Sequence, residues 1–344
     1  MRQRNLALFL AFCMLLAAFV CTQVFSIADN EYRVLCIGES LTCGSGANEA
    51  GTITEQKKDG SGNPVFDSDG NPVMQNSKIN PILTYPGRLD IRLGYGYQVL
   101  NYGISGVAVL PEYKWSWASG GYLAAAKNNP SNPFAASVSD VDYIVIMLGT
   151  NDAKDRIWKT DKGTGGAENF YNYYLEMVRE LQKIPSEPDI ICVIPPPVVN
   201  DGVLNDYEIV EKTLRDEISP IIRRVARENH CMLLDLREVF PNPETEREEL
   251  LSYYAVDDAV HPNKSGYDLI AQSLVPYIKR VKGDVNGSGV TSIDDLSVLA
   301  QYLAKWHDVE IDVLCSDVNL DGVVNLHDLA LIAQYQAKWD VKLY

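Results

Sequence analysis

Short runs of consecutive apolar residues recur along the chain, and longer segments with apolar residues at helical spacing lie between them. An apolar run of this length is typical of a strand buried on both faces of a parallel sheet. Five strands are therefore expected, at Tyr32–Gly38, Tyr97–Gly103, Tyr143–Gly149, Asp189–Pro195 and Cys231–Leu236. Helices are expected at about 167–184, 207–229 and 265–282. This alternation predicts a three-layer α/β/α domain with a parallel sheet.

The end of the chain follows a different pattern, because it repeats itself with a period of 33 residues. GDVNGSGVTSIDDLSVLAQYLAKW begins at Gly283, and SDVNLDGVVNLHDLALIAQYQAKW begins at Ser316. Oxygen-bearing residues stand at alternate positions around a Gly turn, which suits Ca²⁺ because this hard cation takes roughly 6–8 oxygen ligands. The expected ligands are Asp284, Asn286, Ser288, Ser292, Asp295 and the Val290 carbonyl in loop one, and Asp317, Asn319, Asp321, Asn325, Asp328 and the Val323 carbonyl in loop two.

Two other interpretations of this repeat are weaker. Metal-free Asp/Asn/Gly turns do not explain two copies in phase, each followed by a helix with an apolar face. A sensor EF-hand needs an entering helix, and residues 307–315 are too short and irregular to form one. We therefore expect a small all-α unit that binds two structural calcium ions and does not fold without them, because its oxygen ligands would repel one another.

These tandem half EF-hands resemble the dockerin family, over Gly283 to about Lys342. The resemblance implies docking to a cohesin module of a cellulosome-type scaffold. It also implies that the partner is read at the tenth and eleventh loop positions, here Ile293 and Asp294 in loop one and Leu326 and His327 in loop two. The two copies differ at these positions, which argues against a symmetric dual binding mode.

The N-terminus has the features of a secretory signal peptide. Arg2 and Arg4 precede an apolar run from Leu6 to Val20, and small residues at Ser26 and Ala28 fit a cleavage site. The run is shorter than the ~20 residues that span a bilayer, so a membrane anchor is not expected. The predicted organisation is a signal peptide (1–28), an α/β domain (29–282) and a dockerin-like domain (283–344), in a secreted, extracellular protein.

Composition and charge limit the classes of protein to which this chain can belong. The 344 residues are 46% hydrophobic and carry a net charge of −16, which fits a globular protein and shows no basic surface for nucleic acid. The five cysteines left after cleavage form neither a disulfide framework nor a zinc motif.

Polar residues that can support acyl transfer follow the predicted strands. Ser40 follows the first strand, Gly103 ends the second, Asn151 follows the third, and Asp258 and His261 come after the fifth. A serine hydroxyl needs a base, which His261 can supply, and Asp258 can fix the tautomer of that base. The backbone N–H groups of Ser40 and Gly103 and the Asn151 amide can stabilise an oxyanion. No G-x-S-x-G elbow surrounds Ser40, so an α/β-hydrolase is not expected.

This order of motifs resembles the SGNH (GDSL-type) hydrolase family, over most of residues 31–282. The resemblance implies that Ser40 is the nucleophile, that Asp258 and His261 complete the triad, and that Gly103 and Asn151 are oxyanion donors. One departure is that the usual Gly-Asp-Ser is Gly-Glu-Ser here, with Glu39 in place of Asp. Asp257 is a second candidate acid, but the Asp-x-x-His spacing favours Asp258.

Together the two resemblances imply a secreted carbohydrate esterase that removes acetyl groups from plant cell-wall polysaccharide, most simply acetylated xylan, without a catalytic metal. The family also contains lipases, lysophospholipases and thioesterases, so these stay open. A non-catalytic, scaffold-bound glycan-binding module is a third hypothesis, favoured only by Glu39. The polar insertion at 46–80 can rim the site or be a solvated hairpin, and Trp115 and Trp117 can stack on sugar or pack in the core.

Overall fold

The computed structural model describes residues 32–47, 54–56, 74–76, 80–111, 121–128, 140–159, 166–199 and 207–344. The predicted signal peptide, most of the 46–80 insertion, Trp115 and Trp117 lie outside these ranges. Across them, every helix is too short or too polar to cross a bilayer.

Five parallel strands form one sheet in the order β4-β1-β5-β6-β7. The fold predicted from the apolar runs is confirmed, and each predicted strand is present with ends that shift by at most two residues. The bounds are β1 (Tyr32–Gly38), β4 (Tyr97–Gly103), β5 (Tyr143–Met147), β6 (Asp189–Ile194) and β7 (Met232–Asp235). A separate antiparallel pair, β2 (Thr54–Gln56) and β3 (Met74–Asn76), lies in the insertion.

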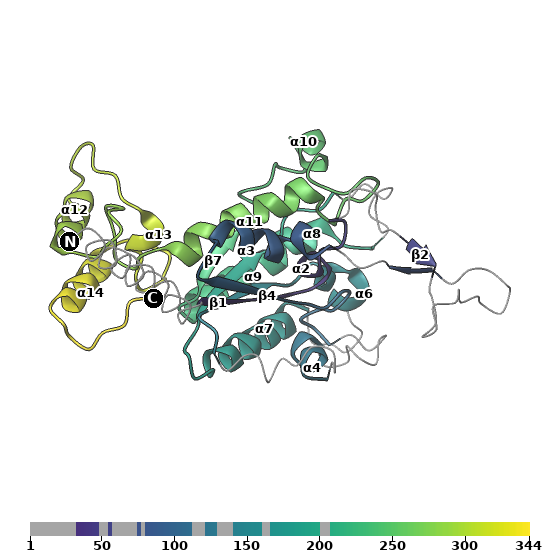
Figure 1. Ribbon diagram of the computed structural model, residues 1–344, viewed down its shortest axis with the longest axis horizontal. Coiled ribbons are helices and arrows are strands. Elements are labelled where there is room, and N and C mark those ends of the chain that lie inside the picture. The colour runs from purple at the N-terminus through teal and green to yellow at the C-terminus, as the bar shows by residue number, and fades with distance from the viewer. Residues whose placement is uncertain are drawn as a thin grey trace, which may run out of the picture.

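Helices cover both faces of the sheet, as Figure 1 shows. Alternate residues of β1 point to opposite faces, so Leu35 joins a core with α7 (Gly166–Gln182) and α9 (Ser219–Glu228), and Val34 joins a core with α3 (Tyr85–Leu93) and α11 (Lys264–Lys279). The shorter helical elements are α2 (Ser40–Cys43), η2 (Pro81–Leu83), α4 (Gly121–Asn128), η4 (Asn151–Ala153), α6 (Asp155–Trp158), α8 (Glu211–Thr213), η5 (Leu214–Ile218) and α10 (Arg247–Leu251).

The helix expected at 207–229 is shorter and less regular than predicted. It begins at Glu211, and a π-helical turn, η5, separates α8 from α9. The cause is Pro220 in the first turn of α9, which cannot donate a backbone hydrogen bond. The Leu214 carbonyl accepts both the Ser219 backbone N–H, which closes the π-helical turn, and the Ser219 hydroxyl, the latter at 2.7 Å.

In the C-terminal repeat, the helices α12 (Ile293–Leu303) and α14 (Leu326–Gln336) follow the two loops at equivalent positions. The Asp at the twelfth loop position, Asp295 or Asp328, accepts the N–H of the N-cap residue and so completes a capping box. Only the four-residue helix α13 (Val313–Ser316) precedes loop two, as the irregular sequence there indicates. Val285, Leu299, Val318 and Ile332 form the core of this small unit.

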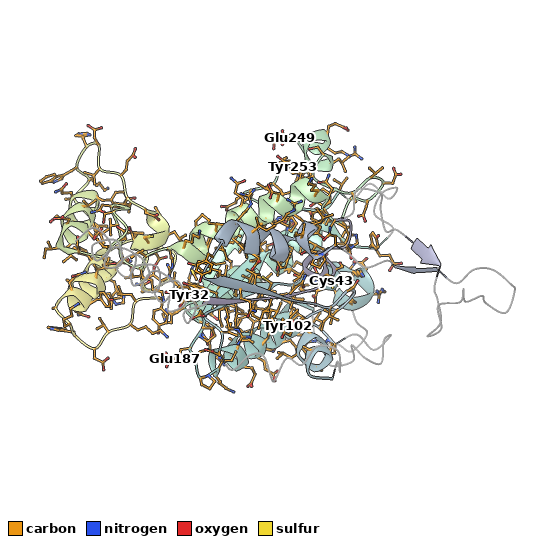
Figure 2. All side chains as sticks on the ribbon, viewed as in Figure 1. Tyr32, Cys43, Tyr102, Glu187, Glu249 and Tyr253 are labelled. Carbon is orange, nitrogen blue, oxygen red and sulfur yellow. The ribbon has the colours of Figure 1, made fainter. Side chains whose placement is uncertain are left out.

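The repeat packs against the amino ends of the strands, away from the loops that follow their carboxyl ends (Figure 1). Lys282 pairs with Asp189 at the start of β6 at 2.8 Å, and Lys342 pairs with Glu187 at 3.0 Å. In Figure 2, Glu187 lies at the end of the sheet that faces the repeat, and Cys43, in the helix of the predicted nucleophile, lies toward the other end.

Candidate active site and calcium loops

Three of the predicted site segments meet at the carboxyl edge of the sheet. They follow the neighbouring strands β4, β1 and β5. The chain adds β4 on one side of β1 and then β5 on the other, and ligands of such folds bind in the crevice where the strand order switches in this way. Ser40 begins α2 directly after β1, and Asn151 begins η4 after β5.

Ser40, His261 and Asp258 form a continuous hydrogen-bonded chain. His261 Nε2 lies 3.0 Å from Ser40 Oγ, and His261 Nδ1 lies 2.7 Å from Asp258 Oδ2. Ser40 and His261 are both only 7% exposed. This geometry places a base on the serine hydroxyl and an acceptor on the far side of the base, which is the arrangement that acyl transfer through serine requires.

Asp258 is held as an ionised acceptor by its surroundings. Burial acts to raise the pKa of Asp258, but the hydrogen bond and charge of His261 and the backbone N–H groups of His261 and Val260 outweigh it and hold the pKa below its usual value. Those N–H groups donate to Asp258 Oδ1 at 2.9 and 2.8 Å. The neighbouring candidate, Asp257, is exposed, and in the described structure the carboxylate that bonds His261 is that of Asp258.

Glu39 supports the loop after β5. It is fully buried, and its Oε2 accepts hydrogen bonds from the backbone N–H of Asn151 at 3.2 Å and from Asn151 Nδ2 at 2.9 Å. Burial raises the pKa of Glu39, against the lowering effect of these hydrogen bonds and of the Lys154 charge. The longer side chain of Glu39 therefore still joins the nucleophile turn to Asn151.

The expected oxyanion donors are only partly free in this structure. The Gly103 N–H donates to Asn101 Oδ1 at 2.9 Å, so it can serve an oxyanion only by giving up that bond. Asn151 Nδ2 donates to Glu39 and also to the Val107 carbonyl at 2.9 Å, so both of its hydrogens are in use. Asn151 can serve an oxyanion only by exchanging one of these bonds.

Gly106 is a donor that sequence reasoning missed. Its backbone has a φ of 78°, and a Cβ built on it would meet nothing within 4 Å. Among the described residues, the N–H groups of Ser40 and Gly106 have no acceptor. The signal was the second Gly of the Asn101–Gly106 segment, which a left-handed turn after β4 requires.

Asp152 is a second residue that the sequence did not single out. It is fully buried, and its two oxygens accept the backbone N–H groups of Leu110 at 2.8 Å and Val109 at 3.0 Å. Burial outweighs these bonds and raises the pKa of Asp152 to about 7. The side chain ties the loop after β4 to the loop after β5.

The oxygen-rich loops of the repeat fit a hard cation. In the part of the chain that the structure describes, no three His, Cys, Asp or Glu side chains converge as a metal site, so the three Asp side chains of loop two, Asp317, Asp321 and Asp328, do not meet as one ligand set in this structure. Asp317 Oδ1 is buried and has no hydrogen-bond partner, and burial raises the pKa of Asp317 and of Asp328. An unpartnered carboxylate oxygen beside another carboxylate is stabilised by Ca²⁺.

The four expected partner-reading residues lie on the surface. Ile293 is 70% exposed and Leu326 71% exposed, and Asp294 and His327 are exposed beside them. His327 Nδ1 also lies 3.1 Å from Asn319 Nδ2. Both copies of the repeat therefore present these positions to solvent.

Comparison with known protein families assigns both parts of the chain to a family. Residues 36–269 match the model of the GDSL-like Lipase/Acylhydrolase family, and residues 282–335 match the Dockerin type I domain. The chain belongs to the GDSL-like lipase/acylhydrolase family. Its acylhydrolase domain is followed by a C-terminal dockerin domain, and dockerin domains generally bind calcium.

Two relatives illustrate the range of the similarity. An acetylxylan esterase from Xylanibacter ruminicola is 26% identical over an alignment of 268 residues that covers 73% of this chain and 44% of that protein. The chain thus spans less than half the length of this relative. The structure of a proposed arylesterase from Agrobacterium tumefaciens is similar with a TM-score of 0.50 and 18% identity, over 72% of this chain and 98% of that one, and it supports the fold.

Proposed function

We propose that this acylhydrolase is a serine esterase that removes acetyl groups from plant cell-wall polysaccharide, with acetylated xylan as its substrate. The observation that carries the proposal is the hydrogen-bonded chain from Ser40 through His261 to Asp258. The acetylxylan esterase from Xylanibacter ruminicola and the dockerin domain support the substrate class.

In this mechanism, Ser40 Oγ attacks the ester carbonyl while His261 Nε2 takes the hydroxyl proton. The imidazolium forms beside the ionised Asp258 carboxylate, which stabilises it. The Ser40 and Gly106 N–H groups stabilise the oxyanion, and the Asn151 amide joins them when it releases Val107. His261 then protonates the sugar oxygen as it leaves. Water, activated by the same imidazole, releases acetate from the acetylated Ser40.

The dockerin domain directs the enzyme to a scaffold. We propose that it binds a cohesin module through Ile293, Asp294, Leu326 and His327, with one Ca²⁺ in each loop. The protein is then extracellular and cellulosome-associated, which the predicted signal peptide (1–28) supports.

The test is acetate release from acetylated xylan by the protein without residues 1–28, beside its Ser40→Ala variant. Release that disappears in the variant supports both the serine mechanism and the substrate. Turnover of an aryl acetate without release from xylan keeps the esterase and removes the xylan assignment. Faster turnover of long-chain acyl esters favours a lipase or thioesterase, and no turnover of any ester favours the glycan-binding module.

A further inference from the structure

Tyr207 contacts both partners of the hydrogen bond that orients the catalytic base. Its hydroxyl donates to Asp258 Oδ2 at 3.3 Å, the same oxygen that His261 Nδ1 approaches. Its ring packs edge to face with the imidazole of His261, with centroids 4.9 Å apart and planes at 86°. Tyr207 lies before α8 and is 40% exposed, so it stands between this hydrogen bond and solvent.

The contact with the Tyr207 ring restricts the rotation of the His261 imidazole. Rotation of the imidazole about its Cβ–Cγ bond would carry Nε2 away from Ser40 Oγ, and a perpendicular ring at this distance obstructs that rotation. The same ring keeps water from one side of the Asp258–His261 hydrogen bond, which is stronger where water is excluded.

We propose that Tyr207 is a positioning residue that holds His261 on Ser40, mainly through its ring; this inference rests on the proposed serine mechanism. Tyr207→Phe keeps the ring and removes the hydroxyl, and Tyr207→Ala removes both. Tyr173→Ala on α7 is the matched control, because Tyr173 is similarly exposed at 38%.

The readouts are kcat and KM on an aryl acetate and the rate at which a fluorophosphonate labels Ser40. We expect Tyr207→Ala to lose roughly 10- to 100-fold in kcat and in labelling rate with KM little changed, because displacement of a catalytic group by about 1 Å costs this much. Tyr207→Phe should stay near the wild type, and so should Tyr173→Ala.

A wild-type kcat in Tyr207→Ala, or a loss in Tyr207→Phe as large as that in Tyr207→Ala, would overturn the role of the ring. In both cases loss of turnover in Ser40→Ala would leave the proposed function standing. Equal rates for the wild type and Ser40→Ala would instead refute the serine mechanism, and the role of Tyr207 with it.

A second inference comes from a different observation: among the described residues, loop two of the dockerin domain contacts the esterase domain and loop one does not. Asn319 O lies 2.6 Å from His230 Nδ1, and a Cβ on Gly322 would lie 3.3 Å from Arg227. Leu320 packs against the esterase core that contains Met232.

Equivalent positions in loop one make no such contact. Asn286, the counterpart of Asn319, is exposed, whereas Asn319 is 5% exposed. Gly287 is the counterpart of Leu320, and nothing lies within 4 Å of a Cβ built on it. The C-terminus extends the contact of loop two, because the Tyr344 ring stacks on His230 at 4.8 Å and the Tyr344 N–H donates to the Val318 carbonyl.

We infer that Ca²⁺ in loop two, and not in loop one, is linked to the stability of the esterase domain. Ca²⁺ that orders loop two also orders the surface that holds Leu320 and Asn319 against α9 and β7. Ca²⁺ binding that stabilises loop two must then also stabilise the esterase domain at α9 and β7, because linkage between two sites is reciprocal. This inference is independent of the catalytic proposal.

The repeat supplies matched variants for the test. Asp284→Ala and Asp317→Ala each remove the first ligand of one loop. Leu320→Gly gives loop two the residue that loop one has, and the backbone of Leu320, with φ at 55°, accepts Gly without strain. Calorimetric titration of each full-length variant with Ca²⁺ gives the number of ions bound, and hydrogen exchange of the β7 peptide (231–236) reports on the esterase domain.

We expect Ca²⁺ to slow exchange in β7 in the wild type and in Asp284→Ala, but not in Asp317→Ala. Leu320→Gly should bind two ions and yet lose the response of β7. A β7 peptide that does not respond to Ca²⁺ in the wild type would overturn the inference, and so would equal responses in the two Asp variants.

Discussion

Replacing Asp258 by Asn isolates the role of this carboxylate, because Asn has the same shape but a donor in place of one acceptor. Asp258 Oδ1 accepts two backbone N–H groups, from Val260 and His261, at 2.8 and 2.9 Å. An amide would keep its oxygen there, since its NH₂ group would otherwise face two donors. The NH₂ group would then face His261 Nδ1 in place of Asp258 Oδ2.

The consequence is a change of tautomer. With a donor facing it, Nδ1 must accept, so the proton of the neutral imidazole moves to Nε2 and points at Ser40 Oγ. Such an imidazole cannot take the serine proton. We expect kcat to fall by about 10⁴, the size of this effect in Ser-His-Asp enzymes, which equals about 5.4 kcal/mol of transition-state stabilisation.

The assay is kcat and KM on an aryl acetate, with Asp257→Asn as control. Asp257 is exposed and adjacent, so this control removes the same charge without touching His261. Its kcat should stay within about twofold of the wild type, because exposed charges contribute little. Retention of more than about a tenth of the activity in Asp258→Asn, or an equal loss in Asp257→Asn, would refute the reasoning about the tautomer.

Three other predictions follow from the surrounding contacts. Glu39→Ala removes the carboxylate that holds Asn151 and should lower kcat at least about tenfold. The upper limit of this loss is the ~3–4 kcal/mol of transition-state stabilisation that one oxyanion donor supplies. The loss of kcat should not be explained by a matching fall in the thermal unfolding temperature. Burial raises the pKa of Asp152 from 3.8 to about 7, so its contribution to the free energy of unfolding is complete below pH 3.8 and is lost as the pH rises through 7. Asp152→Asn should remove this part of the pH dependence, up to about 4 kcal/mol, from the free energy measured by urea unfolding. Chelation of Ca²⁺ should lower the helical circular dichroism that α12 and α14 contribute, and unchanged spectra would contradict the calcium assignment.

The sheet could be predicted from sequence because its strands are apolar on both faces. Continuous runs such as Tyr32–Gly38 leave little choice of structure, and their carboxyl ends then gather Ser40 and Asn151 at one edge. The pairing of Asp258 with His261 followed from their spacing of three residues, which one turn brings together.

What the sequence could not indicate are the contacts between segments far apart in the chain. Which Gly N–H is free depends on where the Asn101 side chain points. Its Oδ1 accepts the Gly103 N–H, whereas the Gly106 N–H has no acceptor among the described residues. The contacts of Asp152 with Leu110 depend on how the loops after β4 and β5 meet. Short helices such as α3 were also missed, because nine residues give little periodicity.

The direction of the parallel strands separates the catalytic segments of the esterase domain from its contact with the dockerin domain. Carboxyl ends of the strands carry Ser40 and Asn151, and amino ends, at Asp189 and Met232, carry the contacts with the dockerin domain. The candidate active site and the contact between the domains therefore use opposite edges of one sheet. Loop two is fixed to the amino edge while Ile293 and Leu326 stay exposed, so a scaffold bound at these proposed positions would lie away from the carboxyl edge that carries Ser40.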